Sequence, residues 1–411
     1  MRILILTQYF PPETGAPQNR LFETAVRLKN AGDQVEILTA MPNYPKNKIF
    51  DEYRGKWFLK EFMLDMPVYR SFVYTGKSRS IISRLLNYFS FVFSSLIAAG
   101  RIKGRFDYVI CESPPLFLGL SAVWISRRKR AKLIFNVSDL WPESAEKLGI
   151  ISNIFLLSSA EKLELWLYKK AFIVSGQTQG IIRRIRERTE HKRLYWLPNG
   201  VDPQFFNPDE TTKSWRTENG FEKDDFLLLY AGIIGHAQGL EVIINAASKL
   251  ENYSGIKFLL VGDGPEKEKL EKLVAERNCK QVYFFPNQEK KQMPAIVNSC
   301  NMTIVPLKRL PLFEGAIPSK IFENLAMKVP VILGVEGEAK NLFIDEGKAG
   351  SAFDPENSED LAQKVLYYFN NPQAVTEAAE SGRNYVLKKF NRDKLAGDFR
   401  TYLLQNVKSE I

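Results

Sequence analysis

Short apolar runs alternate with helical patterns along this chain, and that alternation limits its possible folds more than any other feature. In the first half the runs predict strands at Ile3–Thr7, Val35–Thr39, Val68–Val73, Tyr108–Cys111, Leu133–Val137, Phe172–Ser175 and Leu194–Leu197. Apolar residues at helical spacing lie between several of them, at Asn19–Asn30, Ile81–Ile102, Leu116–Arg127, Ser158–Lys170 and Gln179–Arg188. Strands that are apolar almost throughout predict a parallel sheet with helices on both faces.

The second half repeats this plan after a polar stretch at Phe205–Asp225. Its predicted strands are Leu227–Ala231, Phe258–Val261, Val282–Phe285, Thr303–Pro306 and Val331–Leu333. A chain of 411 residues exceeds what one hydrophobic core usually supports, so two domains are expected, at residues 1–204 and 205–390. Doubly wound sheets bind ligands at the carboxyl ends of their strands, and two facing sheets would place the active site in an interdomain cleft.

Charge and cysteine content narrow the class of protein. The first 200 residues carry 31 Lys and Arg against 17 Asp and Glu, whereas the remaining residues carry 26 against 30. The basic half is expected to meet an anionic membrane, a diphosphate lipid or nucleic acid, unless its charge is simply solvated. No recognition element for nucleic acid accompanies the basic clusters. Three scattered cysteines without a CxxC pair argue against a disulfide framework or zinc site, and the short apolar N-terminus favours a cytoplasmic protein.

The segment Phe313–Ala326 predicts a loop that opens into a helix. Ser319 suits the N-cap, and free N–H groups at a helix start attract phosphate. Lys320 in the first turn is unfavourable beside the positive end of the helix dipole unless an anion is bound. Glu323, one turn on, would accept hydrogen bonds from sugar hydroxyls. These residues suggest a nucleotide-diphosphate site, and a capped surface helix with a solvated lysine is the simpler alternative.

Polar or glycine-rich loops follow other predicted strands, and each has a functional and a structural interpretation. Gly15 would let the backbone approach a diphosphate, or it is a turn glycine. Arg20 would reach acceptor or phosphate, or form a surface salt bridge. Asp139 and Glu143 would hold sugar hydroxyls, or Asp139 caps a turn. Further candidates are Asn199 near the domain boundary and, in the second half, Gly235, His236, Gln238 and Gly262.

The chain also carries a set of motifs in a fixed order: Tyr9–Pro17, Asp139–Glu143, Pro198–Asp202, Tyr230–Gly232, Gly262–Pro265 and Pro318–Glu323. With these it resembles the retaining, nucleotide-sugar-dependent glycosyltransferases of family 4, particularly the O-antigen, capsule and colanic-acid subgroup with N-acetylfucosaminyltransferases. The resemblance implies a GT-B fold, two Rossmann-like doubly wound domains, with a C-terminal helix at residues 391–411 packing back on the first domain. It assigns ribose binding to Glu323.

Three departures from the family pattern change the expected roles. The two cations with which the family usually binds the donor phosphates align with Ile233 and Gln238, neither of which is charged. Lys320 is therefore expected to take over the diphosphate charge. In the segment Phe313–Ala326, the first acidic position of the family falls at Gly315. Glu314, one residue earlier, is the remaining candidate for a sugar contact. Ser138 stands where many members have histidine, which makes Asp139 the acidic candidate.

The expected activity is transfer of an N-acetylated hexosamine or deoxyhexosamine from a UDP-sugar to a lipid-diphosphate-linked saccharide, as in bacterial surface polysaccharide synthesis. Lys320, Asp139 and Glu314 are the candidate catalytic residues. Gly15, Gly235, Gln238, Gly262, Ser319, Glu323 and Asn199 are expected to bind the donor with Lys320, and Arg20 and Glu143 the acceptor. No metal or cofactor is expected, and membrane contact would be peripheral. A UDP-sugar 2-epimerase of GT-B form and a non-catalytic nucleotide-sugar-binding module remain alternatives.

Overall fold

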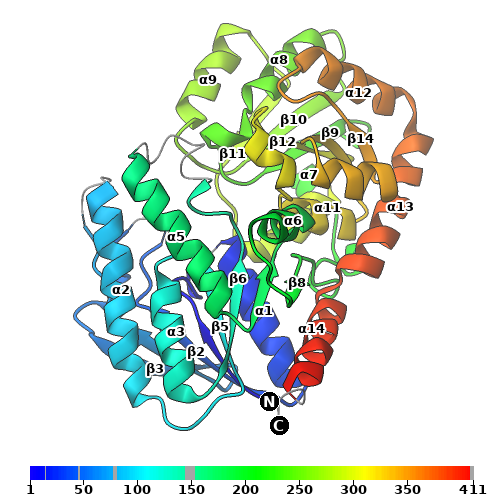
Figure 1. The fold of residues 1–411 in the computed structure, drawn as a ribbon. Coiled ribbons are helices and arrows are strands. Elements are labelled where there is room, and N and C mark those ends of the chain that lie inside the picture. Colours follow the sequence, from blue (N-terminus) through cyan, green and yellow to red (C-terminus); the bar gives the residue numbers. More distant parts are fainter. Residues whose placement is uncertain (14, 45–46, 77–80, 144–152, 408–411) are drawn as a thin grey trace. The chain divides into compact units, whose positions relative to one another are not determined.

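The structure is a computed structural model, and it describes residues 1–13, 15–44, 47–76, 81–143 and 153–407. The chain divides into two compact units. Unit 1 comprises Met1–Asn199 together with Arg392–Ile411, and unit 2 comprises Gly200–Asn391. Each unit contains a largely parallel sheet with helices on its faces (Figure 1). The predicted α/β class, with a Rossmann-like sheet in each half, is therefore confirmed.

Unit 1 has one eight-stranded sheet in the order β3-β4-β2-β1-β5-β6-β7-β8. Neighbouring strands are parallel except for the antiparallel edge pair β3 and β4, and β3 was not predicted. The bounds are β1 Arg2–Leu6, β2 Gln34–Ala40, β3 Phe58–Met63, β4 Met66–Ser71, β5 Tyr108–Ser113, β6 Lys132–Val137, β7 Ile173–Gly176 and β8 Leu194–Trp196. The structure thus contains the strands predicted for the first half, with ends shifted by one or two residues.

Helices cover both faces of this sheet, as its all-apolar strands require. Successive residues of β1 enter different cores: Leu4 and Leu6 one core, Ile3 and Ile5 the other. On the first face lie α2 Ile81–Arg101, α3 Leu118–Lys129, α5 Ile154–Lys170 and α6 Gln179–Arg188. Figure 1 shows α2, α3 and α5 along this face, where α3 packs against both neighbours. The other face is covered by α1 Ala16–Asn30 and α14 Arg392–Val407.

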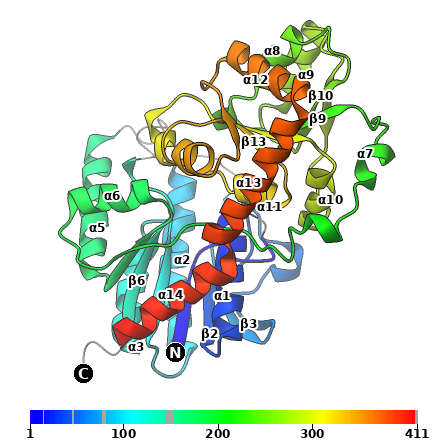
Figure 2. The same ribbon diagram turned by 90° about the vertical axis from the view of Figure 1, so that its right-hand side faces the viewer.

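The C-terminal helix α14 packs against α1 in unit 1 (Figure 2). Its buried Phe399 and Leu403 enter the core of that face. The hydroxyl of Tyr108 in β5 donates to the carbonyl oxygen of Leu403 at 2.8 Å. The Arg400 guanidinium also pairs with the Asp33 carboxylate at 2.7 Å. Residues nearly 370 positions apart in the chain therefore complete one hydrophobic core.

Unit 2 has a six-stranded parallel sheet in the order β11-β10-β9-β12-β13-β14. The bounds are β9 Phe226–Ala231, β10 Ile256–Val261, β11 Val282–Phe285, β12 Met302–Pro306, β13 Val331–Gly334 and β14 Gly350–Ala352. Its helices are α7 Ser214–Glu218, α8 Glu241–Lys249, α9 Lys267–Glu276, α10 Met293–Asn298, α11 Lys320–Ala326, α12 Ser358–Asn370 and α13 Pro372–Phe390. Short 3-10 turns η3 His236–Gln238 and η5 Pro311–Gly315 follow β9 and β12. The strands predicted for this half are all present.

None of the helices within the described ranges combines the length and hydropathy that a bilayer span requires. The longest apolar candidate, α2, lies instead on the sheet of unit 1, where Phe91 and Ala99 are fully buried.

Candidate functional site

The candidate residues form two groups, one at the carboxyl ends of the strands in each unit. In unit 2 the loops after β9 and β10 touch through their backbones. A Cβ at Gly262, where φ is +151°, would lie 1.9 Å from the carbonyl oxygen of Gly232. A Cβ at Gly264 would lie 2.3 Å from that of Ile234. Glycine is therefore required at these positions for the loops to approach, which gives Gly262 a structural role whatever it binds.

Lys320 lies directly beside this glycine contact. A Cβ at Gly232 would come within 2.8 Å of the Lys320 ammonium nitrogen, so the absent side chain makes room for the cation. The ammonium lies 3.9 Å from the centroid of the Tyr230 ring, at the end of β9. Desolvation lowers the pKa of Lys320 to about 7, although the nearby Glu323 carboxylate favours the charged form. Within the described residues, Lys320 forms no ion pair with a carboxylate.

The other residues of the predicted anion segment surround Lys320. Ser319 occupies the N-cap position of α11, as predicted, but its hydroxyl makes no capping hydrogen bond. The N–H groups of Ile321 and Phe322 instead bond to the carbonyl oxygens of Pro318 and Ser319 at 3.1 and 3.2 Å. Glu323 is half-buried on the first turn of α11. This short helix thus carries Lys320 and Glu323 near its N-terminus and buries Ile321, Phe322 and Leu325.

Glu314 lies outside this helix, in the turn η5. Its side chain is exposed. Its carbonyl oxygen would lie 2.2 Å from a Cβ at Gly337, where φ is +74°, so the turn is packed against the loop that follows β13. The structure thus fixes the Glu314 backbone and leaves its carboxylate at the surface.

The loop after β9 also holds Gly235, His236 and Gln238. Gly235 is buried just before the turn η3, and a Cβ there would lie 2.9 Å from the Gln238 side-chain oxygen. Lys308, which sequence reasoning did not single out, meets this loop from the end of β12. Its backbone N–H donates to the carbonyl oxygen of Ala237 at 2.9 Å. Only its position after a buried strand could have indicated its role.

In unit 1 the Glu13 carboxylate organises the loop that leads to Gly15. It accepts hydrogen bonds from the backbone N–H groups of Phe10, Asn43 and Tyr44 at 3.0, 2.7 and 2.8 Å. Burial raises the pKa of Glu13, and these donors oppose that rise. Gly15 follows as the residue before α1, in an extended conformation. A Cβ at Gly15 would lie 2.4 Å from the Gln18 side-chain oxygen, so this turn of α1 is closely packed.

Arg20 is buried in a polar network at the ends of β5 and β6. Its guanidinium pairs with the Glu112 carboxylate and donates to the Ser138 hydroxyl at 2.7 Å. The Asn136 amide donates to the other Glu112 oxygen at 2.7 Å, and the Ser138 hydroxyl also bonds to Glu112. Because the Arg20 side chain is 6% exposed, we assign it a positioning role rather than direct acceptor contact. Glu112 was missed, although a glutamate ending the apolar strand Tyr108–Ser113 was a usable signal.

This network supports the loop that carries Asp139 and Glu143. Asp139 follows Ser138 and is exposed at the end of β6. The Trp141 ring meets Phe117 edge to face at 5.5 Å, which packs the loop against the start of α3. Glu143 pairs with Arg184 of α6 at 3.3 Å. Of the two predicted carboxylates, Asp139 is thus better placed to meet a ligand.

Asn199 is the last residue of unit 1 and is 3% exposed. Its side-chain oxygen accepts a hydrogen bond from Arg392 at 3.1 Å, and Arg392 also pairs with Glu23 of α1. These contacts tie the chain leaving unit 1 to the start of α14.

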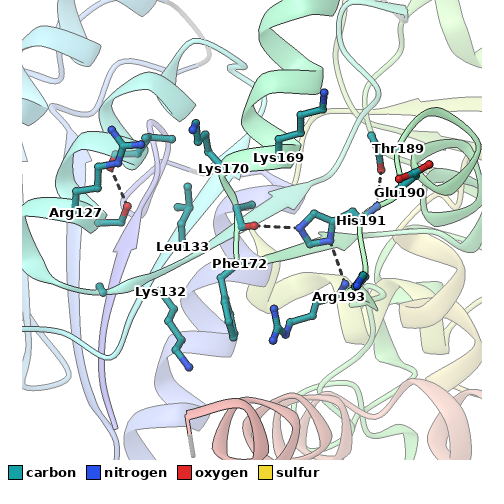
Figure 3. Close-up of a pocket in the computed structure, with 15 residues that line it drawn as sticks. Arg127, Lys132, Leu133, Lys169, Lys170, Phe172, Thr189, Glu190, His191 and Arg193 are labelled. Atoms are coloured by element: carbon teal, nitrogen blue, oxygen red, sulfur yellow. Dashed lines mark hydrogen bonds between the residues drawn. The ribbon is translucent and has the colours of Figure 1, made fainter. Parts of the chain in front are cut away.

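A cavity of about 600 Å³ in unit 1 lies at the amino ends of β6, β7 and β8, whereas the candidate residues lie at the carboxyl ends of the strands (Figure 3). Its lining includes none of the predicted site residues. Phe172 contacts Lys132 and Arg193, whose charged groups lie 4.3 and 4.2 Å from its ring centroid. Lys169, Lys170 and Arg127 come from the last turns of α5 and α3, where cations stabilise the negative end of the helix dipole. This cavity is therefore separate from the candidate site.

Across the parts of the chain that the structure describes, no three His, Cys, Asp or Glu side chains gather closely enough to hold a metal ion. The candidate groups contain cations, glycines and carboxylate side chains, and such residues suit a phosphate-bearing ligand with a sugar.

Comparison with known proteins identifies relatives among the glycosyltransferases. Residues 211–385 match the family described as Glycosyl transferases group 1. The chain is 26% identical over 411 residues to the Escherichia coli K12 protein WcaI, named as a colanic acid biosynthesis glycosyl transferase, and the match covers 96% of this chain and 99% of WcaI.

Solved glycosyltransferase structures share the fold over the whole length. Sucrose-phosphate synthase from Thermosynechococcus elongatus has a TM-score of 0.78 at 16% identity, covering 98% of both chains. Anabaena HepE, solved with UDP-glucose, has a TM-score of 0.73 at 15% identity, covering 98% of this chain and all of that one. This chain thus carries a glycosyl transferases group 1 domain at residues 211–385 and is a glycosyltransferase of the GT-B fold.

Proposed function

We propose that this glycosyltransferase moves an N-acetylated hexosamine or deoxyhexosamine from UDP to a saccharide on a lipid diphosphate, with retention of anomeric configuration. The product would enter a bacterial surface polysaccharide. The name of WcaI, which refers to colanic acid biosynthesis, supports that setting. The UDP-glucose in the HepE structure supports a UDP-linked donor. Retention and the class of sugar rest on the motif resemblance.

The observation that carries the proposal is the Lys320 ammonium, held beside Gly232 and Tyr230 without an ion-pair partner in the described chain. A desolvated cation is costly unless an anion joins it. A donor diphosphate would supply that anion, and its charge increases as the bond to the sugar breaks. Lys320 would therefore stabilise the transition state more than the ground state.

The reaction breaks the bond between the anomeric carbon and the diphosphate oxygen and forms one to an acceptor hydroxyl oxygen. In a retaining transfer the new bond forms on the face from which the diphosphate departs. The departing phosphate oxygen can then take the acceptor proton, so atoms and charge balance without another base. Glu323 near Lys320 would bind the ribose, and Asp139, supported by Ser138 and Arg20, would bind sugar hydroxyls in unit 1.

An acceptor on a lipid also fits the outer sides of α2 and α3. Leu86, Phe93 and Ile97 of α2 are 50%, 64% and 70% exposed, at spacings that place them on one helix face. Trp124 of α3 is 43% exposed, with the Arg128 guanidinium 5.4 Å from its ring centroid. Neither helix contains Asp or Glu. An apolar surface with cations and no acids suits peripheral contact with an anionic membrane, at its cytoplasmic side.

Incubating the purified protein with radiolabelled UDP-sugars, with and without membrane lipid extract, tests the proposal. Transfer should produce radiolabelled lipid in the reaction that contains the extract, and no radiolabelled product should form without the extract. Sugar conversion without acceptor would instead identify the UDP-sugar 2-epimerase. Binding without any product would identify the nucleotide-sugar-binding module. Flotation with phosphatidylglycerol vesicles tests membrane contact, because Phe93→Ser with Ile97→Ser should reduce the bound fraction several-fold and leave the melting temperature unchanged.

A further inference from the structure

The loop after β9 lacks cations at the two positions where the motif resemblance places them. Ile233 is 61% exposed there, and Gln238 ends the turn η3. A diphosphate carries about two negative charges at neutral pH, and one lysine at Lys320 would neutralise only part of them. A further cation in the loops of unit 2 would therefore be needed.

Lys308, which follows the neighbouring strand β12, supplies a cation beside the loop after β9. Strands β9 and β12 pair directly in the sheet, and Lys308 is the second residue after β12. Its backbone N–H bonds to the carbonyl oxygen of Ala237 at 2.9 Å, which fixes it to the turn η3. Its side-chain stem covers Gly239, where φ is +57° and a Cβ would come 3.1 Å from the lysine Cγ. The glycine thus makes room for the lysine, as Gly232 does for Lys320.

The ammonium of Lys308 lies beside His236, the first residue of the turn η3. Its Nζ lies 3.2 Å from Nδ1 and 3.1 Å from Nε2 of the imidazole. An ammonium has only hydrogens to donate, so the ring contributes its acceptor nitrogen to this contact. A lysine and a histidine that meet in this way present two potential anion ligands where the loops after β9 and β12 come together.

Lys308 contributes to lowering the pKa of the Glu241 carboxylate, so some negative charge lies near it. Within the described residues, Lys308 forms no ion pair with a carboxylate. The adjacent Arg309, by contrast, pairs with Asp354. Glu241, which begins α8 after the same loop, pairs with Lys269 at 2.7 Å. Arg309 and Glu241 thus each form an ion pair, and Lys308 forms none among the described residues.

We propose that Lys308, held in place by His236 and Gly239, binds the diphosphate of the nucleotide donor together with Lys320. The proposal rests on the proposed function, because it assigns a further residue to the same donor site. It explains how the chain dispenses with cations at positions 233 and 238. In place of two basic residues on one loop, the structure uses one lysine after β12 and one at the start of α11.

Calorimetric titration of the full chain with UDP, inorganic pyrophosphate and uridine tests this assignment. Lys308→Gln should raise the Kd for UDP and for pyrophosphate at least tenfold and leave uridine binding unchanged. Lys308→Arg, which keeps the charge, should bind UDP within threefold of the original protein. The matched control is Lys249→Gln at the end of α8, which removes a charge that pairs with Glu359 and should leave every Kd unchanged.

Lys308→Gln and Lys308→Met keep the stem that covers Gly239, so both should retain the original melting temperature. Unchanged UDP affinity in these folded variants would overturn the assignment. An equal loss of uridine and UDP affinity would do so too, because it would indicate a disturbed loop. If pyrophosphate binding depends on Lys308 while no sugar is transferred, the assignment stands and the proposed function fails. If transfer is normal and Lys308→Gln binds like the original protein, only the assignment fails.

Discussion

Lys320 and Tyr230 are in contact across the end of β9, with the ammonium 3.9 Å from the ring centroid. The ring face offers a cation some electrostatic attraction, but far less than a carboxylate would. Gly232, beside them, leaves the space that the ammonium occupies. Unit 2 thus holds a desolvated lysine amine at the carboxyl ends of its strands, and that property makes Lys320 the best candidate for contact with the leaving group.

Replacing Lys320 by Ala should lower kcat at least tenfold, which corresponds to about 1.4 kcal/mol of transition-state stabilisation. The loss should appear in kcat more than in KM, because charge on the leaving diphosphate increases only as the bond breaks. Lys249→Ala, at the C-terminal end of α8, serves as the control. Steady-state kinetics with the labelled donor would measure both variants. An unchanged kcat for Lys320→Ala would remove Lys320 from the site.

Binding of UDP should draw a proton from solution at pH 8. The pKa of Lys320 is lowered to about 7 by desolvation, so the free protein is mostly uncharged at this position above pH 7. A diphosphate beside the amine favours the ammonium and raises its pKa, and UDP itself is already fully ionised at pH 8. Calorimetry in buffers of different ionisation enthalpy should therefore detect proton uptake at pH 8. Lys320→Arg, which stays charged, should bind without uptake.

Lys320→Met should stabilise the fold while it impairs activity. The depressed pKa of Lys320 in the original protein means that the unfolded chain binds more protons than the folded one between about pH 7 and pH 10. The cost of the buried charge is thus fully present at pH 7 and below, and it disappears as pH rises towards 10. Denaturant titration should give the variant an advantage of about 1 to 3 kcal/mol at pH 7, less than the full shift implies because the side chain is only half-buried. An advantage that grows with pH would contradict this account.

The sequence alone was sufficient for the strands that are mostly apolar, and insufficient for two that are not. Strand β3, Phe58–Met63, has the charged pair Lys60 and Glu61 in its middle, so it shows neither a long apolar run nor a regular alternation. Its turn uses Leu64 and Asp65 at positive φ instead of the usual Asn-Gly pair. Strand β14, Gly350–Ala352, has no apolar run at all. Helix α5 begins four residues earlier than predicted because the Asn153 side chain caps it, accepting from Phe155 N–H at 3.0 Å.

For the site, the sequence placed candidates at strand ends but did not supply their partners. Glu112 and Arg20 are distant in the chain, so their pairing depends on the neighbouring positions of β5 and α1. Lys308 likewise meets His236 only because β9 and β12 are adjacent. Periodicity within one segment carries no information about which loops become neighbours, and motif resemblance covers only residues that the motif contains.

Gly262→Ala should destabilise unit 2 severely. A Cβ at this position would lie 1.9 Å from the Gly232 carbonyl oxygen, and φ of +151° is a backbone conformation that L side chains rarely adopt. Moving either loop would also displace Lys320. We expect a loss of at least about 3 kcal/mol by denaturant titration, or no folded protein. The matched control is Gly100→Ala in α2, where no atom lies within 4 Å of the new Cβ and helix propensity should add up to about 1 kcal/mol.

The buried pair of Arg20 and Glu112 should behave as a coupled unit. Arg20→Met would leave the Glu112 carboxylate buried without its main cation, at a cost of about 3 to 5 kcal/mol. Adding Glu112→Gln removes the stranded charge, so the double variant should recover a large part of that loss, which a double-mutant cycle measures. Both variants remove the Arg20 hydrogen bond to Ser138, which precedes Asp139, and should therefore lower kcat even when the fold is restored. Full activity in the stable double variant would show that the network supports the core of unit 1 and not the Asp139 loop.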